Sequence, residues 1–232
     1  MLFPQMLYAG KTAIKQVNIY SASKYSGEYN LAIEQALNLV KQSELYDEDF
    51  KFNLFLDGGK SAGYLLKQTM GDAYAWGYYH NVVINKDAVV DGDWLKLRNY
   101  QRHFARTLAH EMIHCLEVNK LGWLHSKPLK QLPDWKWEGY AEYIAYKSAT
   151  KDEKIILKDN IGFMMHCINE KKDWIEVSVD QGKTYTSLNY LKGWLMVKYL
   201  IDIKKFSFTE LMDNVHTEET VLPKMMEWYK MQ

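Results

Sequence analysis

The sequence has little of several features that would assign it to a class at once. It holds 2 Cys and 4 Pro in 232 residues, and its 29 Lys and Arg balance its 29 Asp and Glu. Two cysteines do not make a disulfide framework, so the chain fits a reducing compartment or an exported protein without disulfides. A neutral chain without a basic, aromatic-interleaved stripe offers nothing to a phosphate backbone, so we expect no nucleic-acid partner.

Long hydrophobic runs are absent as well. The stretch Met1–Ala9 is apolar, but it is too short for a membrane span and lacks a basic start. No other stretch is long enough, so we expect no integral membrane segment in this chain. Because Met1–Ala9 also fits the remnant of a removed signal or anchor, the compartment stays open between the cytoplasm and export. The oligomeric state is open too.

What the chain does contain is an HExxH motif, since residues 110–114 read His-Glu-Met-Ile-His within an apolar helical pattern. Residues four apart lie on one helix face, so His110 and His114 can present two imidazoles to one metal ion. Glu111 lies about 100° further round the helix, where it can reach a metal-bound water. Two ligands and a general base from one helical turn are what a zinc hydrolase needs, and they predict one Zn²⁺ per chain.

A catalytic zinc site needs a third protein ligand, and residues 137–143 read Trp-Glu-Gly-Tyr-Ala-Glu-Tyr. HExxH followed by E-G-x-A-E-Y resembles the gluzincin metallopeptidases, especially the peptidase MA-like and aminopeptidase N-like branches. In those families the Glu of the E-G pair is the third zinc ligand, which implies Glu138 here. In thermolysin-like gluzincins an acidic residue at the corresponding offset hydrogen-bonds a zinc-bound His, which implies this role for Glu142. The alternative for Glu142 is a solvent-facing charge.

Residues 190–194 read Tyr-Leu-Lys-Gly-Trp. They resemble the Y-x-x-G segment of aminopeptidase N-like enzymes, whose Tyr stabilises the tetrahedral oxyanion, and this implies a catalytic Tyr190. Since the chain has 17 Tyr, a packing role is the alternative. Those enzymes also hold the substrate's amino terminus with a G-x-M-E-N element. None precedes the motif here, which favours an endopeptidase over an aminopeptidase.

Apolar periodicity predicts an α+β fold. The expected elements are strands over Ala13–Tyr20 and Phe50–Leu56, a hairpin over Ala73–Asn85, a long helix from an N-cap at Asp93 to about Asn119, and further helices over 161–169, 188–203, 208–215 and 217–229. By resemblance the fold is zincin-like, a single catalytic domain over 1–232. Its N-terminal lobe (about 10–122) would hold a small mixed sheet and the metal-bearing helix, and its C-terminal lobe (about 123–232) would be helical.

Zincins commonly place an edge strand along the cleft, just before the metal helix. By resemblance and position this role falls on Val82, Val83 and Ile84, as an edge strand that binds an extended substrate. The neighbour of the motif, Cys115, points to a different helix face from His114 and is predicted to be a small core residue rather than a ligand.

The predicted function is therefore that of a zinc metallopeptidase of endopeptidase type, with a peptide or protein as substrate. Glu111 would take a proton from the bound water, which attacks the scissile carbonyl, and pass it to the leaving amine, while zinc and Tyr190 share the oxyanion. One alternative is a catalytically silent zinc-bound module that holds a peptide or glycan. The other is a metal-free interaction protein in which the HExxH is accidental.

Overall fold

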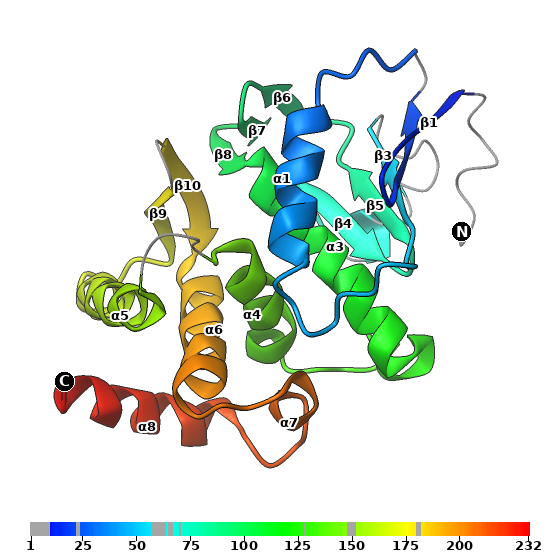
Figure 1. Cartoon of the computed structure of the whole chain (residues 1–232). Helices are drawn as coiled ribbons and strands as arrows, with labels where there is room; N and C mark the ends of the chain where they lie inside the picture. Colours follow the sequence, from blue (N-terminus) through cyan, green and yellow to red (C-terminus); the bar gives the residue numbers. More distant parts are fainter. Residues whose placement is uncertain are drawn as a thin grey trace. The chain divides into compact units, whose positions relative to one another are not determined.

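The computed structural model describes residues 10–21, 24–56, 64, 67–69, 71–127, 129–147, 152–179 and 182–232, so Met1–Ala9 lies outside the described residues. The fold is α+β, as the sequence predicts. The chain divides into two compact units, Met1–Gln131 and Leu132–Gln232. The first unit carries a mixed sheet with helices α1 and α3, and the second is mostly helical (Figure 1).

Five strands of the first unit form one sheet in the order β1-β2-β3-β5-β4. Their bounds are Gly10–Ile14 (β1), Val17–Ser21 (β2), Phe52–Phe55 (β3), Ala75–Tyr78 (β4) and Asn81–Ile84 (β5). The three inner strands are parallel, and both outer strands are antiparallel to their neighbours. Helix α1 (Asn30–Val40) connects β2 to β3, because parallel neighbours need a crossover. The single strand predicted over 13–20 is a hairpin instead, with Lys15 at φ 52° in its turn.

The prediction that Val82, Val83 and Ile84 form an edge strand is wrong. Strand β5 pairs with β3 on one side and with β4 on the other, and all four of its residues are buried. The hairpin itself is where the sequence predicts it, but its second strand inserts beside β3. The unbroken apolar run Val82–Ile84 is typical of a strand that is covered on both faces. The edge strands of the described sheet are β1 and, on this side, β4.

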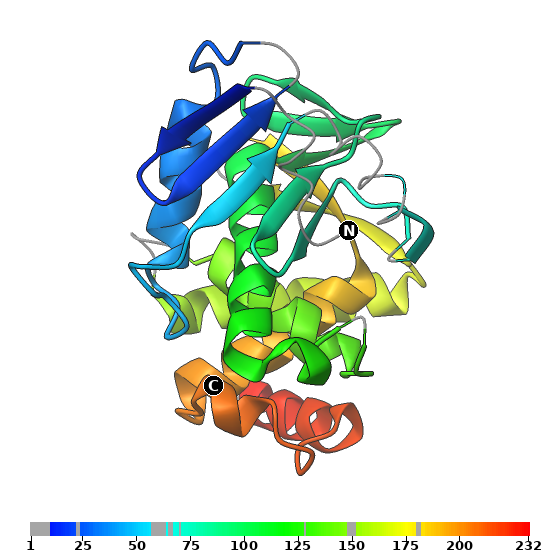
Figure 2. The ribbon, with the colours of Figure 1, turned by 90° about the vertical axis from the view of Figure 1, so that its right-hand side faces the viewer.

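Helix α3 (Phe104–Leu121) carries the HExxH motif and packs against β4 and β5, with α1 beside it (Figure 2). From Phe104 to Val118 all but one of its residues are buried, which explains why the motif is flanked by apolar side chains. The helix ends where the sequence predicts, at Gly122 with φ 81°, a backbone conformation that favours glycine.

The start of this helix differs from the prediction. Asp93 is not its N-cap, because residues 89–103 form a three-stranded sheet of β6 (Val89–Asp91), β7 (Trp94–Leu97) and β8 (Tyr100–His103). Burial alternates along β7, and Arg98 adopts φ 56° in the turn that follows it. Both features are typical of a hairpin, so the helix begins only at Phe104.

Gly77 sets how closely β4 approaches α3. A Cβ atom at this position would lie 2.0 Å from the backbone oxygen of Glu111, a separation that no side chain tolerates. The edge strand therefore passes directly against the helical turn that carries Glu111, and only glycine permits that contact.

The second unit begins with α4 (Asp134–Ala145). It continues with α5 (Glu153–Asn169), the hairpin of β9 (Trp174–Val179) and β10 (Gly182–Ser187), α6 (Leu188–Lys198) with a π-helical turn at Tyr199–Ile203, α7 (Phe208–Leu211) and α8 (Glu218–Lys230). The helices predicted over 161–169, 188–203, 208–215 and 217–229 correspond to α5, α6 with the π-helical turn, α7 and α8, although α5 starts earlier and α7 ends sooner. The β9–β10 hairpin was not predicted.

Two glycines allow α4 and α6 to pack backbone against backbone. A Cβ on Gly139 would lie 2.7 Å from the carbonyl oxygen of Gly193, and a Cβ on Gly193 would lie 3.1 Å from the Cα of Trp135. These are the glycines of the E-G and Y-x-x-G segments. In this structure the two glycines allow the backbones of α4 and α6 to approach closely. Glu138 on α4 and Tyr190 on α6 are therefore carried by two helices in direct contact.

A buried charged cluster also ties α4, α5 and α6 together. Lys198 is 1% exposed, and its Nζ donates to Asp202 at 2.8 Å and to Glu153. The Tyr143 hydroxyl donates to Asp202 at 2.7 Å, and burial together with that carboxylate raises the pKa of Tyr143. Because each charge meets an opposite charge, the cluster is tolerated inside the unit.

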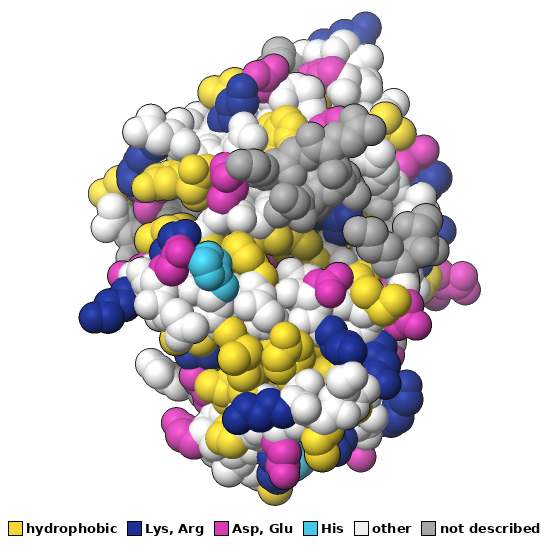
Figure 3. Space-filling model, turned by 90° about the vertical axis from the view of Figure 1, so that its left-hand side faces the viewer, with side chains coloured by type: hydrophobic (Ala, Val, Ile, Leu, Met, Phe, Trp, Pro, Cys, Tyr) yellow, Lys and Arg dark blue, Asp and Glu magenta, His cyan; other side chains and the backbone are white. Residues whose placement is uncertain are grey.

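The surface mixes charges of both signs, as expected of a chain with equal numbers of acidic and basic residues. On the face drawn in Figure 3, Lys and Arg side chains are interspersed with Asp and Glu. Among the described residues, no helix has the length and apolar character needed to cross a bilayer.

Candidate metal centre

Two histidines of α3 form the core of the candidate site. His110 and His114 are 3% and 5% exposed, and their Nε2 atoms lie 3.0 Å apart. Their rings stand perpendicular, with centroids 4.7 Å apart. As the sequence predicts, the i, i+4 spacing brings one imidazole nitrogen of each histidine close to the other.

The His114 ring is held by a carboxylate that the sequence analysis missed. Its Nδ1 lies 2.7 Å from Oε2 of Glu117, whose side chain is fully buried. A carboxylate accepts hydrogen bonds, so Nδ1 donates and Nε2 is left with its lone pair directed at His110. Glu117 thus performs at His114 the orienting role that the family resemblance assigned to Glu142.

The signal for Glu117 was present in the sequence. It follows His114 by three residues, a spacing that places two side chains on neighbouring helical turns. It also stands between Leu116 and Val118, in a stretch where an acidic residue is buried only at a cost unless it has a partner.

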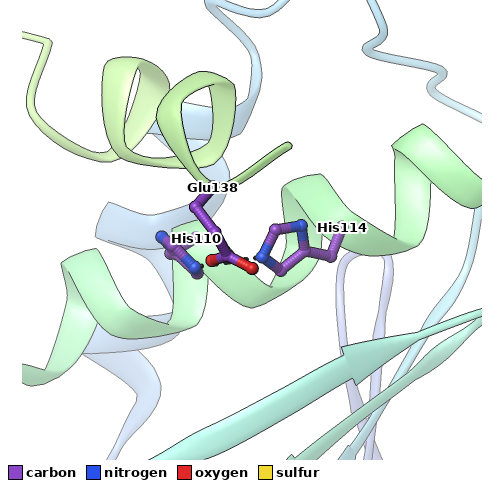
Figure 4. Close-up of side chains that lie close together, drawn as sticks. All are labelled: His110, His114 and Glu138. Carbon is purple, nitrogen blue, oxygen red and sulfur yellow. Dashed lines mark hydrogen bonds between the residues drawn. The ribbon is translucent and has the colours of Figure 1, made fainter. Parts of the chain in front are cut away.

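Glu138 lies on α4 and is half-buried. Among the described residues, His110, His114 and Glu138 are the one group of His, Cys, Asp and Glu that could hold a metal ion, with ligand atoms all within 4.8 Å of one another. Figure 4 shows the two imidazoles and the Glu138 carboxylate pointing toward one another. The structure thus brings together the two histidines that the spacing predicts as ligands and the Glu138 that the resemblance implies.

Glu111 lies next to His110 on α3 and is 7% exposed. It is not part of the ligand group, as expected of a residue on a different side of the helix. Its backbone oxygen is the atom that faces Gly77 of the edge strand β4. The backbone of the catalytic-base candidate therefore lies directly against β4.

Glu142 and Tyr190 lie in the second unit, and both line one small cavity together with Trp194. Glu142 is 2% exposed, so it is not a solvent-facing charge. Tyr190 is half-buried in the first turn of α6, where its backbone N–H donates to the capping hydroxyl of Ser187 at 3.2 Å. The structure thus brings these two predicted residues together, whereas the roles predicted for them stay predictions.

Cys115 is fully buried and its Sγ lies 3.6 Å from the backbone oxygen of Asn81 on β5. Burial, with the nearby Glu111 carboxylate, raises the pKa of this thiol well above its usual range. A protonated, buried thiol is a poor metal ligand, so Cys115 is a core residue as predicted.

Comparison of the chain with protein-family models, with curated proteins and with solved structures finds no match. The function of this chain is therefore inferred from the residues of the site itself.

The Glu117 contact leads to a first testable expectation. Glu117→Gln keeps the size of the side chain but replaces the charged acceptor of the His114 proton, so we expect zinc affinity to fall by about 10–100-fold. The measurement is a zinc dissociation constant from competition with a chromophoric chelator. Glu34→Gln, the same change at a residue of α1 whose side chain is 45% exposed, is the matched control. An unchanged constant in Glu117→Gln would show that the contact does not orient the ligand.

Proposed function

We propose that this protein is a zinc-dependent metallopeptidase of the gluzincin type, with His110, His114 and Glu138 as ligands of one Zn²⁺. The observation that carries the proposal is the buried pair of imidazoles on α3, with one ring oriented by Glu117. Two nitrogens that bind one tetrahedral zinc ion at about 2.0–2.1 Å are separated by roughly 3.3 Å. The separation of 3.0 Å between the two Nε2 atoms is close to that value.

The chemistry of the donor set also fits zinc. Two neutral imidazoles and one carboxylate form a ligand set known from zinc hydrolases, and three protein ligands leave a position open. When bound, zinc would supply Lewis acidity that lowers the pKa of a coordinated water and polarises a carbonyl group.

Glu111 supplies the proton transfers in this proposal. Its carboxylate accepts a proton from the attacking water and later delivers it to the departing amine nitrogen, which otherwise would leave as an unstable anion. Tyr190 would donate its phenolic proton in a hydrogen bond to the oxyanion. The buried carboxylate of Glu142 lines the same small cavity as Tyr190.

The edge strand β4 is the proposed docking strand for an extended peptide substrate, in place of β5. A sheet edge binds a peptide through main-chain hydrogen bonds. Because Gly77 brings β4 into contact with the helical turn of Glu111, a peptide added along β4 would pass close to the proposed base. A main-chain mode of binding favours cleavage within a chain, which supports an endopeptidase.

Metal content tests the ligand set. We expect one zinc per chain in the wild-type protein by mass spectrometry, and loss of zinc in His110→Ala and Glu138→Ala that exceeds the roughly 10–100-fold weakening typical of an outer partner. Asp134→Ala is the control for Glu138, since it changes an exposed carboxylate in the first turn of the same helix.

Peptide-library cleavage, with and without chelator, tests the activity. Cleavage that the chelator abolishes and added zinc restores is the expected result. Zinc binding without cleavage of any library member would favour the silent binding module. Equal zinc in Glu138→Ala and the wild type would remove Glu138 from the site, and a wild-type protein that binds no zinc would contradict the proposal as a whole.

A further inference from the structure

The loop that follows α3, of which the structure describes residues 122–127 and 129–130, has features that the metal site does not use. It holds its shape through its own hydrogen bonds: His125 N–H donates to the Gly122 oxygen at 3.0 Å, and Lys130 N–H donates to the Ser126 oxygen at 2.9 Å. The hydroxyl of Ser126, a residue that is fully buried, donates to the Trp123 oxygen at 3.2 Å. The loop therefore has a hydrogen-bonded conformation of its own at the carboxyl end of α3 (Figure 2).

Large apolar side chains of this loop are exposed. Trp123 is 53% exposed, Leu124 59% and Leu129 55%. Single exposed apolar residues are common on protein surfaces, but three within seven positions of an ordered loop are not. The exposure of Trp123 and Leu124 costs solvation free energy, which a surface that covers them would recover.

The same stretch is basic within a neutral chain. Three lysines, Lys120, Lys127 and Lys130, lie between Glu117 and Asp134, and the sequence has no acidic residue between those two. Glu117 is buried against His114, so its charge is not displayed on the surface. Lys120 and Lys130 are exposed and Lys127 is half-buried. The stretch therefore combines exposed apolar side chains with the two exposed lysines Lys120 and Lys130.

We propose that this loop docks on the surface of an anionic lipid bilayer, with Trp123, Leu124 and Leu129 in the headgroup region and the exposed Lys120 and Lys130 against anionic headgroups. Trp and Leu side chains beside Lys are the composition that binds at a membrane interface, and each Lys near an anionic leaflet adds attraction. Such docking is peripheral and needs no spanning helix.

A lipid surface fits the loop better than a protein partner. A stable protein interface needs about 800 Å² from each side, which is more than three side chains of a short loop provide. A second copy of the chain, docked loop to loop, would bring the two sets of lysines together and be repelled. A bilayer needs only a few inserted side chains and supplies the opposite charge.

Vesicle flotation of the full chain tests this docking. We expect binding to phosphatidylcholine vesicles in which a third of the lipid is phosphatidylserine, and roughly thirtyfold weaker binding to phosphatidylcholine alone, since Lys120 and Lys130 each contribute. Trp123→Ala with Leu124→Ser should weaken the first binding by about tenfold or more. The matched control is Trp174→Ala, which removes from β9 a Trp that is 62% exposed.

Two further measurements test the role of the lysines and the insertion of Trp123 into the lipid. Lys120→Glu with Lys130→Glu should abolish binding to the anionic vesicles, whereas Lys224→Glu with Lys230→Glu on α8 should reduce it only slightly. Brominated lipid should quench the fluorescence of the wild type more than that of Trp123→Phe, which keeps an aromatic ring and should still bind.

Equal binding to both vesicle types, or anionic binding that the Trp123 and Leu124 changes leave intact, would overturn the proposal. Failure of the wild type to bind any vesicle would overturn it too. These measurements read binding without activity, so their outcome is independent of the zinc-peptidase proposal.

Discussion

Glu111→Gln should leave the protein folded and loaded with zinc, yet lower kcat for peptide cleavage by about 10²–10⁴-fold, the usual contribution of a general acid–base group. The substitution keeps the size and hydrogen-bonding shape of the side chain but removes its ability to hold a proton. Glu111 is nearly buried, so an isosteric change is needed to avoid a cavity. It is not a member of the ligand group, so zinc stoichiometry should not change.

The measurement is kcat on a cleaved library peptide at saturating zinc, together with metal content on the same sample. Glu117→Gln is an informative comparison, because it should weaken zinc binding while most of the rate per bound zinc remains once zinc is saturating. The two variants therefore separate loss of the base from loss of the metal. Full turnover by Glu111→Gln with bound zinc would contradict the role of Glu111 as the base.

Gly77→Ala should be the most destabilising single-methyl change in the first unit, by about 3 kcal/mol or more, since overpacking of this severity is at the upper end of its usual cost. The added Cβ would lie 2.0 Å from the Glu111 backbone oxygen. Neither partner can move alone, because β4 is hydrogen-bonded to β5 and α3 is buried along its length. Either the strand leaves the helix or the unit unfolds.

Thermal unfolding measures this effect, and a loss of about 3 kcal/mol corresponds to a fall in Tm of roughly 10 °C. Gly162→Ala on α5 is the matched control. Its Cβ would meet only the hydroxyl end of Tyr229, at 3.2 Å, and Ala favours a helix over Gly by about 1 kcal/mol. We expect that variant to be close to the wild type in stability. A Gly77→Ala protein that melts with the wild type would mean that β4 is not held against the HExxH turn.

The part of the site that could be predicted from the sequence is the part that one helix determines. The spacing of His110 and His114 fixes their common face through the helical period, and Gly122 marks the helix end. Glu117 obeys the same local rule, but its importance depends on burial, which a single sequence does not display. The resemblance directed attention to Glu142 instead.

Errors in the fold came from short segments whose local pattern fits two structures. The polar and charged residues of 93–103 fit the first turns of a helix by their local pattern, whereas in the structure they form β7 and β8. In the β4–β5 hairpin, the sequence indicates two adjacent strands but not which of them pairs with β3. That choice depends on residues far away in the chain, and it decides that β4 rather than β5 is an edge strand.

The sequence by itself determined an α+β chain with two imidazoles on one helical face, because side-chain directions within a helix follow from its period alone. Only the tertiary structure decided that Glu117 orients His114, that Gly77 seats β4 against Glu111, and that Gly139 and Gly193 let α4 meet α6. These features depend on burial and on the approach of backbones from distant segments, which the packing of the folded chain determines and no local pattern encodes.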